Sequence, residues 1–253
     1  MKKLIVANWK MNPLALKEAK KLFSEVTKGV SRIKKTDIVI CPPFLYLEKL
    51  RKLSKKISIG AQDAFPGEVG AFTGEVSVDM LYDLGIKYVI LGHSERRVMG
   101  ENNSDINKKI KSALGTGLIP IVCVGEKERD NNHAYFNTVK AQVEETLVGV
   151  NKNLIPKIII AYEPVWALSS SVNRRDATST DSKEMVLFIR KVLTDMTSPM
   201  IASQVRIIYG GSANENDAQD FLKNGGVDGL LPGKASLDPN KFVEIVKIAE
   251  KIQ

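Results

Sequence analysis

Three side chains that can transfer a proton, or stabilise the negative charge that its removal leaves, each follow a short apolar run of the chain: Lys10, His93 and Glu163. A carboxylate can take a proton from a carbon beside a carbonyl group, while an imidazole and an ammonium group stabilise the enediolate that forms. Glycine-containing turns at residues 210–212 and at Gly233 offer backbone N–H groups that suit a phosphate. Together these residues favour proton transfer on a phosphorylated carbonyl compound.

Other common enzyme chemistries lack their sequence signals. The spacing of the two histidines, His93 and His133, is not that of zinc ligands, and neither is the spacing of the two cysteines. A GxSxG nucleophile elbow, a Walker motif and a GxGxxG fingerprint are also absent. We therefore expect neither a metal ion nor a nucleotide cofactor.

Each candidate residue also has an ordinary structural interpretation. Lys10 alone would be a solvated surface lysine, and His93 alone would be a hydrogen-bonded structural histidine. Glu163, which precedes Pro164, would simply end a strand. The functional interpretation depends on the co-occurrence of these residues at the ends of different predicted strands.

A repeating alternation of elements would bring these residues together. Short apolar runs rich in β-branched residues predict eight strands, at residues 4–7, 38–41, 57–59, 88–91, 119–124, 158–161, 205–209 and 227–231. These runs are almost continuously hydrophobic, which is typical of parallel strands covered on both faces. Helical spacing lies between them, at residues 17–30, 104–114, 136–147, 182–196, 217–223 and 239–252, and more loosely at 45–53 and 77–84.

Eight strand and helix pairs in 253 residues predict an α/β fold, a (β/α)₈ barrel with a closed, parallel eight-stranded sheet. The alternative is a doubly wound open sheet. No linker or composition break divides the chain, so residues 1–253 are expected to form one domain. Active sites of such barrels lie on the loops after the carboxyl ends of the strands, where the candidate residues stand.

Composition narrows the remaining functions. With 43% hydrophobic and 26% charged residues, the chain is expected to fold with a sizeable core. The 37 basic and 29 acidic residues give a net charge of +8, which attracts anions, but the basic residues are scattered and few aromatic residues accompany them. Nucleic-acid binding is therefore not expected. Without a recognisable signal peptide or membrane span, the protein is predicted to be cytoplasmic, with Cys41 and Cys123 as buried thiols.

Four motifs give the chain a family resemblance. They are Asn8-Trp9-Lys10-Met11-Asn12, Gly92-His93-Ser94-Glu95-Arg96-Arg97, Ala161-Tyr162-Glu163-Pro164-Val165-Trp166-Ala167 and Tyr209-Gly210-Gly211-Ser212. In this order they resemble the NWKMN, GHSERR, AYEPVWA and YGGS motifs of the triosephosphate isomerase family. The match runs from Asn8 to the final predicted helix.

The resemblance implies a role for each residue that matches a motif. Glu163 would be the base that moves a proton between the two carbons of dihydroxyacetone phosphate and glyceraldehyde 3-phosphate, and no cofactor is implied. His93 would be a neutral electrophile at the start of a short helix near Ser94. Lys10 would supply positive charge to the substrate and the enediolate, with Asn8 orienting it.

Supporting and phosphate-binding roles follow in the same way. Glu95 would tether Lys10, although a purely structural ion pair is an equal alternative. Backbone N–H groups near Ser212, Gly233 and Lys234 would hold the phosphate. Lys234 replaces a glycine usual in the family, so its ammonium group is expected to add an anion contact and its backbone turn is expected to be strained.

The resemblance also implies a homodimer. The family inserts its third loop beside the neighbouring active site, and residues 62–75 end in Gly70-Ala71-Phe72-Thr73-Gly74-Glu75, which resembles the family's GAFTGE. Thr73 would then lie near the partner's site.

One departure concerns the family's lid. Residues 168–176 are about three residues longer than usual and contain no glycine, and a non-glycine residue at positive φ costs about 1 kcal/mol or more. The lid is therefore expected to close differently. We hypothesise that Arg174 or Arg175 pairs with the phosphate; the alternative is that both are solvated and the lid is looser.

Two other functions fit parts of the sequence. A pentose-phosphate epimerase would use a similar barrel but usually needs a metal site. A non-catalytic barrel that serves as a binding scaffold would explain the altered lid, but the sequence retains Lys10, His93 and Glu163.

Overall fold

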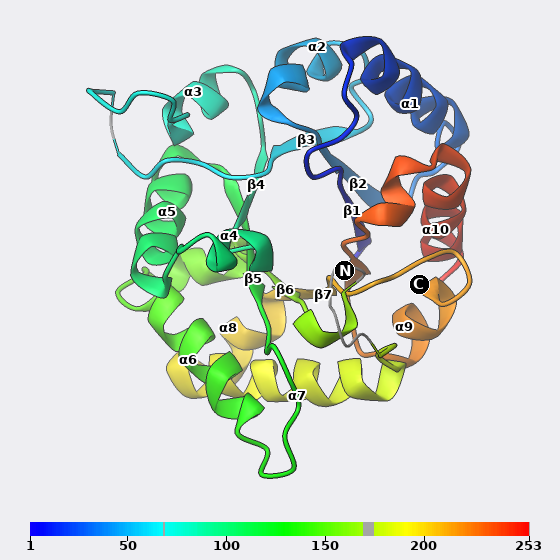
Figure 1. The fold of residues 1–253 in the computed structure, drawn as a ribbon. Helices are drawn as coiled ribbons and strands as arrows, with labels where there is room; N and C mark the ends of the chain where they lie inside the picture. The colour runs from blue at the N-terminus through cyan, green and yellow to red at the C-terminus, as the bar shows by residue number, and fades with distance from the viewer. Residues whose placement is uncertain (68, 169–174, 253) are drawn as a thin grey trace.

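A computed structural model describes residues 1–67, 69–168 and 175–252, and its strands form a closed parallel barrel in chain order (Figure 1). The strands are β1 (Lys3–Asn8), β2 (Thr36–Cys41), β3 (Ser58–Ala61), β4 (Tyr88–Leu91), β5 (Ile119–Val124), β6 (Ile159–Tyr162), β7 (Arg206–Tyr209) and β8 (Gly229–Leu230). The predicted (β/α)₈ barrel is confirmed. The alternative of an open sheet is excluded because β8 pairs with β1.

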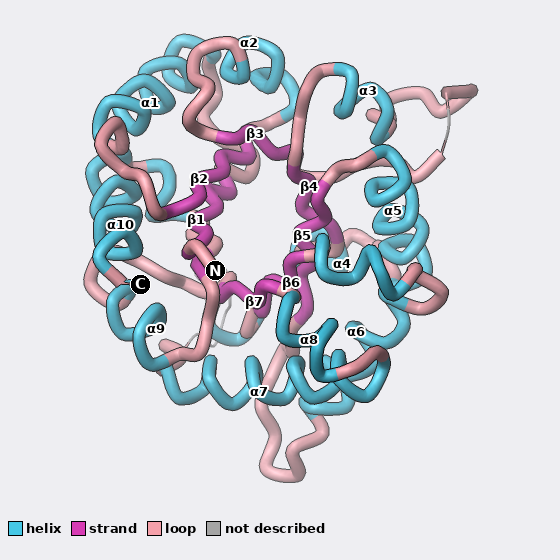
Figure 2. The backbone as a smooth tube through the Cα atoms, turned by 180° about the vertical axis from the view of Figure 1, so that it is seen from behind, coloured by secondary structure: helices cyan, strands magenta, loops and turns pink. Residues whose placement is uncertain are grey.

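Helices surround this ring of strands on the outside (Figure 2). The α-helices are α1 (Leu16–Gly29), α2 (Leu47–Arg51), α3 (Val78–Asp83), α4 (Ser94–Val98), α5 (Asn103–Thr116), α6 (Tyr135–Leu147), α7 (Ser179–Met196), α8 (Pro199–Gln204), α9 (Ala218–Asn224) and α10 (Pro239–Lys251). Short 3₁₀ helices are η1 (Phe44–Tyr46), η2 (Lys152–Lys157), η3 (Val165–Ala167) and η4 (Lys234–Leu237). Each predicted helical segment contains a helix.

Local signals explain where several helices begin. Asn102 caps α5 by accepting a hydrogen bond from the Asp105 N–H, and Thr178 forms a reciprocal capping box with Asp181 at the start of α7. Helix α8 was not predicted. Its start follows the same rule, because Ser198 caps it and Pro199 occupies its first turn.

The strands bury side chains on both faces, which explains their continuous hydrophobic pattern. Leu4 and Val6 of β1 point into the barrel interior, whereas Ile5 and Ala7 belong to the larger core between strands and helices. Cys41 and Cys123 are buried free thiols in the interior cluster.

Barrel closure requires a close approach of β8 to β1. A Cβ atom on Gly229 would lie 1.9 Å from the Leu4 carbonyl oxygen, so only glycine fits this register. Along the described part of the chain, no helix is both long and apolar enough to cross a membrane. The assignment of residues 1–253 to one domain stays a prediction.

Candidate active site

Six of the residues that the sequence analysis selected line one pocket of 500 Å³, a size usual for small-molecule sites. Those lining it are Asn8, Lys10, His93, Ser212, Gly233 and Lys234. They lie at or just after the carboxyl ends of β1, β4, β7 and β8. We call this cavity the substrate pocket.

Lys10 occupies a strained backbone position at the substrate pocket. Its φ of 52° lies in the left-handed region, which side chains other than glycine rarely adopt. The Lys10 N–H donates to Asn8 Oδ1 at 3.0 Å, and the Gln62 side chain donates to the Lys10 carbonyl oxygen at 2.8 Å. At the other end of the side chain, Lys10 Nζ pairs with Glu95 Oε1 at 2.5 Å. Backbone and side-chain contacts therefore hold the ammonium group in place.

The position of His93 specifies its tautomer. The imidazole is buried, and its Nδ1 accepts a hydrogen bond from the Glu95 N–H at 3.2 Å, at the start of α4. A nitrogen that accepts carries no proton, so the ring proton lies on Nε2. The short helix expected near Ser94 is present. His93 thus offers one N–H donor from a neutral ring.

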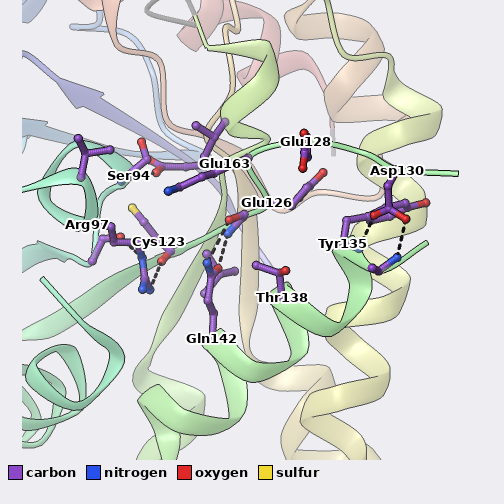
Figure 3. A pocket seen from close by; sticks show the side chains of 17 residues that line it. Ser94, Arg97, Cys123, Glu126, Glu128, Asp130, Tyr135, Thr138, Gln142 and Glu163 are labelled. Carbon is purple, nitrogen blue, oxygen red and sulfur yellow. Dashed lines mark hydrogen bonds between the residues drawn. The ribbon is translucent and has the colours of Figure 1, made fainter. Parts of the chain in front are cut away.

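Glu163 lies beside His93 but is turned away from the substrate pocket. Its Oε1 is 3.3 Å from His93 Nε2 without the alignment of a hydrogen bond, and its Oε2 accepts the Ser94 N–H at 3.1 Å. The carboxylate lines a separate pocket of 350 Å³, shown in Figure 3. In that pocket, burial and the charge of Glu163 raise the pKa of the Cys123 thiol, which therefore stays protonated.

The two loops after β7 and β8 form the opposite wall of the substrate pocket. The N–H groups of Ser212 and Gly233 donate to no other described residue, so both are available to an anion. The Ser236 hydroxyl donates to the Gly233 carbonyl oxygen at 2.6 Å and fixes this loop. Lys234 begins η4 and is not at positive φ, so the expected backbone strain at Lys234 is wrong.

Arg175 is exposed, as in the alternative of a solvated side chain, and it also lies against an aromatic ring. Its guanidinium carbon lies 4.3 Å from the Trp166 ring centroid, a cation–π contact, and it is not a lining residue of the substrate pocket. The Trp166 indole N–H donates to Glu126 Oε1 at 2.8 Å. Arg174 and most of the predicted lid, residues 169–174, lie outside the described residues.

Several residues at the site were missed. Gln62 follows β3 at its carboxyl end, so the barrel rule that selected Lys10 would have found it too. Lys241 also lines the substrate pocket and pairs with Glu215 Oε1 at 3.1 Å, but it comes from α10 and no motif marks it. Within the described ranges, no group of three or more His, Cys, Asp or Glu side chains is placed to hold a metal ion.

The loop at residues 62–75 extends from the barrel beside α3 (Figure 1). Phe72 packs on Phe65 with ring centroids 4.4 Å apart, yet it is half-exposed, and the neighbouring Thr73 is exposed. Residue 68 of this loop lies outside the described chain. An extended loop with exposed apolar residues is suited to contact a partner.

Comparisons with known proteins agree with this geometry. A family model described as triosephosphate isomerase matches residues 3–249. A triosephosphate isomerase of Dictyoglomus thermophilum is 45% identical over 97% of this chain and 99% of its own length. Those of Aquifex aeolicus and Dehalococcoides mccartyi are 41% and 42% identical, covering 97% and 100% of this chain and 99% of their own lengths.

Proposed function

The chain belongs to the triosephosphate isomerase family, and we propose that Glu163, His93 and Lys10 carry its reaction. The protein is an intramolecular isomerase that interconverts dihydroxyacetone phosphate and glyceraldehyde 3-phosphate. The observation that supports these roles best is one pocket lined by Lys10, His93 and both phosphate-binding loops, with the Glu163 carboxylate 3.3 Å from His93.

Substrate binding comes first. The phosphate lies against the N–H groups of Ser212 and Gly233, and the ammonium group of Lys234 adds positive charge. Lys10, held by Glu95 and by its strained backbone, faces the carbonyl end. This arrangement fixes the reacting carbons between the loops and His93.

Proton transfer requires Glu163 to turn. The carboxylate leaves the Ser94 N–H and takes a proton from C1 of dihydroxyacetone phosphate, while the electrons of that bond move to the carbonyl oxygen and form the enediolate. His93 donates its Nε2 proton toward the two substrate oxygens, and Lys10 stabilises the negative charge. Glu163 then returns its proton to C2, while His93 passes the proton of the C1 hydroxyl to the oxygen on C2, so that C1 becomes the aldehyde. No cofactor is part of this proposal.

We extend the proposal to a homodimer formed through residues 62–75. The exposed Thr73 would reach the neighbouring active site. Met11, in the loop after β1, and Leu45, in η1 after β2, are exposed and would be covered in the interface. The cytoplasmic location predicted from the sequence is part of the same proposal.

Turnover by the purified protein tests the assignment. With a chelator present, glyceraldehyde 3-phosphate should be converted to dihydroxyacetone phosphate, because the proposed steps use side chains alone. Glu163→Asp, which shortens the base by one methylene, should lower kcat by about 10²-fold or more. Absence of turnover in a folded dimer, or an undiminished rate in the variant, would refute the roles.

A further inference from the structure

The loop after β5 supports the chain segment that carries the proposed base. The Glu163 N–H donates to the Val124 carbonyl oxygen at 2.8 Å, and the Val165 N–H donates to the Glu126 carbonyl oxygen at 2.9 Å. Gly125 lies between these two contacts, so close that a Cβ atom on it would stand 1.8 Å from the Glu163 carbonyl oxygen. The main chain of Glu163 therefore packs directly on Gly125, and a shift of Gly125 would displace Glu163.

Gly125 has few constraints of its own. Strand β5 ends at Val124, and residues 125–134, all of which the structure describes, contain no helix or strand before α6 begins at Tyr135. Glycine also adopts a wider range of backbone angles than other residues. The N–H and C=O groups of Gly125 consequently need partners outside the barrel sheet if the loop is to hold one position.

Gln142 of α6 supplies both partners. Its Oε1 accepts a hydrogen bond from the Gly125 N–H at 2.7 Å, and its Nε2 donates to the Gly125 carbonyl oxygen at 3.1 Å. Figure 3 shows the Gln142 side chain pointing from α6 toward this loop, with both bonds dashed. Among the described residues, no other hydrogen bond reaches either group. A carboxamide suits this task because it has an acceptor and a donor side by side without a charge.

Gln142 is itself fixed by the helix that carries it. Val139 and Val143, which stand before and after Gln142 in α6, are both fully buried. A helix anchored in the core in this way moves less than an exposed loop. Contacts thus run without interruption from the core through Gln142 and Gly125 to Glu163. Because a displacement of about 1 Å can slow catalysis by about 10²-fold, these contacts bear on proton transfer.

We propose that Gln142 is a positioning residue for Glu163. It lines the pocket of 350 Å³ rather than the substrate pocket, so it acts through Gly125 and not on the reacting atoms. The inference rests on the proposed role of Glu163 as the base. Gly125 fixes the main chain from which the carboxylate turns toward C1. Loss of the two Gln142 hydrogen bonds should therefore slow proton transfer, while substrate binding by the loops after β7 and β8 stays nearly unchanged.

Steady-state kinetics of two matched variants test the proposal. Gln142→Met keeps the length of the side chain but removes both hydrogen bonds, and should lower kcat about tenfold with KM within about twofold. Asn107→Leu is the control. Asn107 of α5 also holds two backbone groups, the carbonyl oxygens of Thr146 at 2.7 Å and Val148 at 3.0 Å, but at the carboxyl end of α6. Its loss should leave kcat and KM within about twofold of wild type.

A kinetic isotope effect identifies the step that slows. Dihydroxyacetone phosphate with both hydrogens of C1 replaced by deuterium reports how far cleavage of the C1–H bond limits turnover. In Gln142→Met the isotope effect on kcat should be at least as large as in wild type, because slower proton abstraction limits turnover more. A general loss of stability leaves this ratio unchanged, since both substrates are measured with the same folded protein.

Gln142→Glu provides a second, independent measurement. Its ionised carboxylate can accept from the Gly125 N–H but repels the Gly125 carbonyl oxygen, whereas the protonated carboxyl group restores both hydrogen bonds. The ratio of kcat in Gln142→Glu to kcat in Gln142→Met should therefore rise as pH falls from about 9 to about 6. The other charged side chains of this pocket are present in both variants and cancel in the ratio: Arg97, Glu126, Lys127, Glu128, Asp130 and Glu163.

A wild-type kcat in Gln142→Met, an equal loss in Asn107→Leu, a smaller isotope effect or a ratio that is flat across pH would each overturn the proposal. If Gln142→Met does not fold, the pH dependence of Gln142→Glu relative to wild type decides. An undiminished rate in Glu163→Asp would instead contradict the proposed function. Impaired Glu163→Asp beside unimpaired Gln142→Met would overturn only the positioning role, so the two failures are distinguishable.

Discussion

The strained backbone of Lys10 leads to a prediction about stability as well as activity. Lys10→Gly and Lys10→Ala both remove the ammonium group and its 2.5 Å ion pair with Glu95. The two variants differ in how readily the residue at position 10 adopts a positive φ. Glycine adopts a φ of 52° freely, whereas alanine retains the strain.

The size of the difference follows from opposing effects. The left-handed conformation costs a residue with a Cβ about 2 kcal/mol. Glycine loses about 1 kcal/mol more than alanine in chain entropy on folding. Lys10→Gly should therefore be more stable than Lys10→Ala by about 1 kcal/mol, which corresponds to about 3 °C in Tm for a chain of this size.

Urea and thermal unfolding at matched protein concentration measure this difference, since dimerisation would make stability concentration-dependent. Both variants should lose about 10²-fold or more in kcat/KM, because both lack the charge that stabilises the enediolate. If Lys10→Ala is as stable as Lys10→Gly, the argument that strain is stored at the active site is wrong.

Three further perturbations test other parts of the structure. Arg175→Ala should change tryptophan fluorescence and leave KM within about twofold, because the guanidinium lies 4.3 Å from an indole ring rather than on the substrate pocket. Burial, reinforced by nearby negative charge, raises the pKa of half-buried Asp217 from 3.8 to about 6. The folded state thus binds this proton more tightly than the unfolded state does. The unfolding free energy should therefore fall by about 1 kcal/mol, after allowance for solvent screening, as pH rises from 4 to 6. Asp217→Asn should remove this pH dependence of the unfolding free energy. Gly125→Ala should destabilise the protein by about 3 kcal/mol and lower kcat, since its Cβ would lie 1.8 Å from the carbonyl oxygen of the proposed base.

Each of these expectations has a control or a contradicting result. A tenfold rise in KM for Arg175→Ala would restore the hypothesis that this arginine pairs with phosphate. Unfolding free energies measured across pH should diverge between wild type and Asp217→Asn; parallel curves would contradict the raised pKa. Gly115→Ala, a helical position where a Cβ meets nothing within 4 Å, is the control for Gly125→Ala and should be neutral or stabilising.

The fold and the location of the site could be predicted because both depend on local patterns. Continuous apolar runs marked the parallel strands, and in a barrel the residue after each strand lies at the same rim. Lys10, His93 and the turn at Gly233 are far apart in sequence yet line one pocket for that reason.

Other features depend on tertiary contacts that no local pattern carries. The left-handed backbone at Lys10 results from hydrogen bonds to Asn8 and Gln62. The orientation of Glu163 depends on the Ser94 N–H, which another loop supplies. The stacking of Arg175 on Trp166 joins residues on either side of residues 169–174, far enough apart that no local pattern predicts the contact. These contacts could be recognised only once the barrel had brought the loops together.

Hydrogen exchange during turnover tests the central claim most directly. A carboxylic acid exchanges its proton with solvent, so a proton carried by Glu163 can be replaced before it is returned to carbon. When dihydroxyacetone phosphate is converted in deuterium oxide, the account predicts deuterium at C2 of the glyceraldehyde 3-phosphate product, and no product or exchange with Glu163→Gln. Turnover or deuterium incorporation that persists undiminished in Glu163→Gln would contradict it.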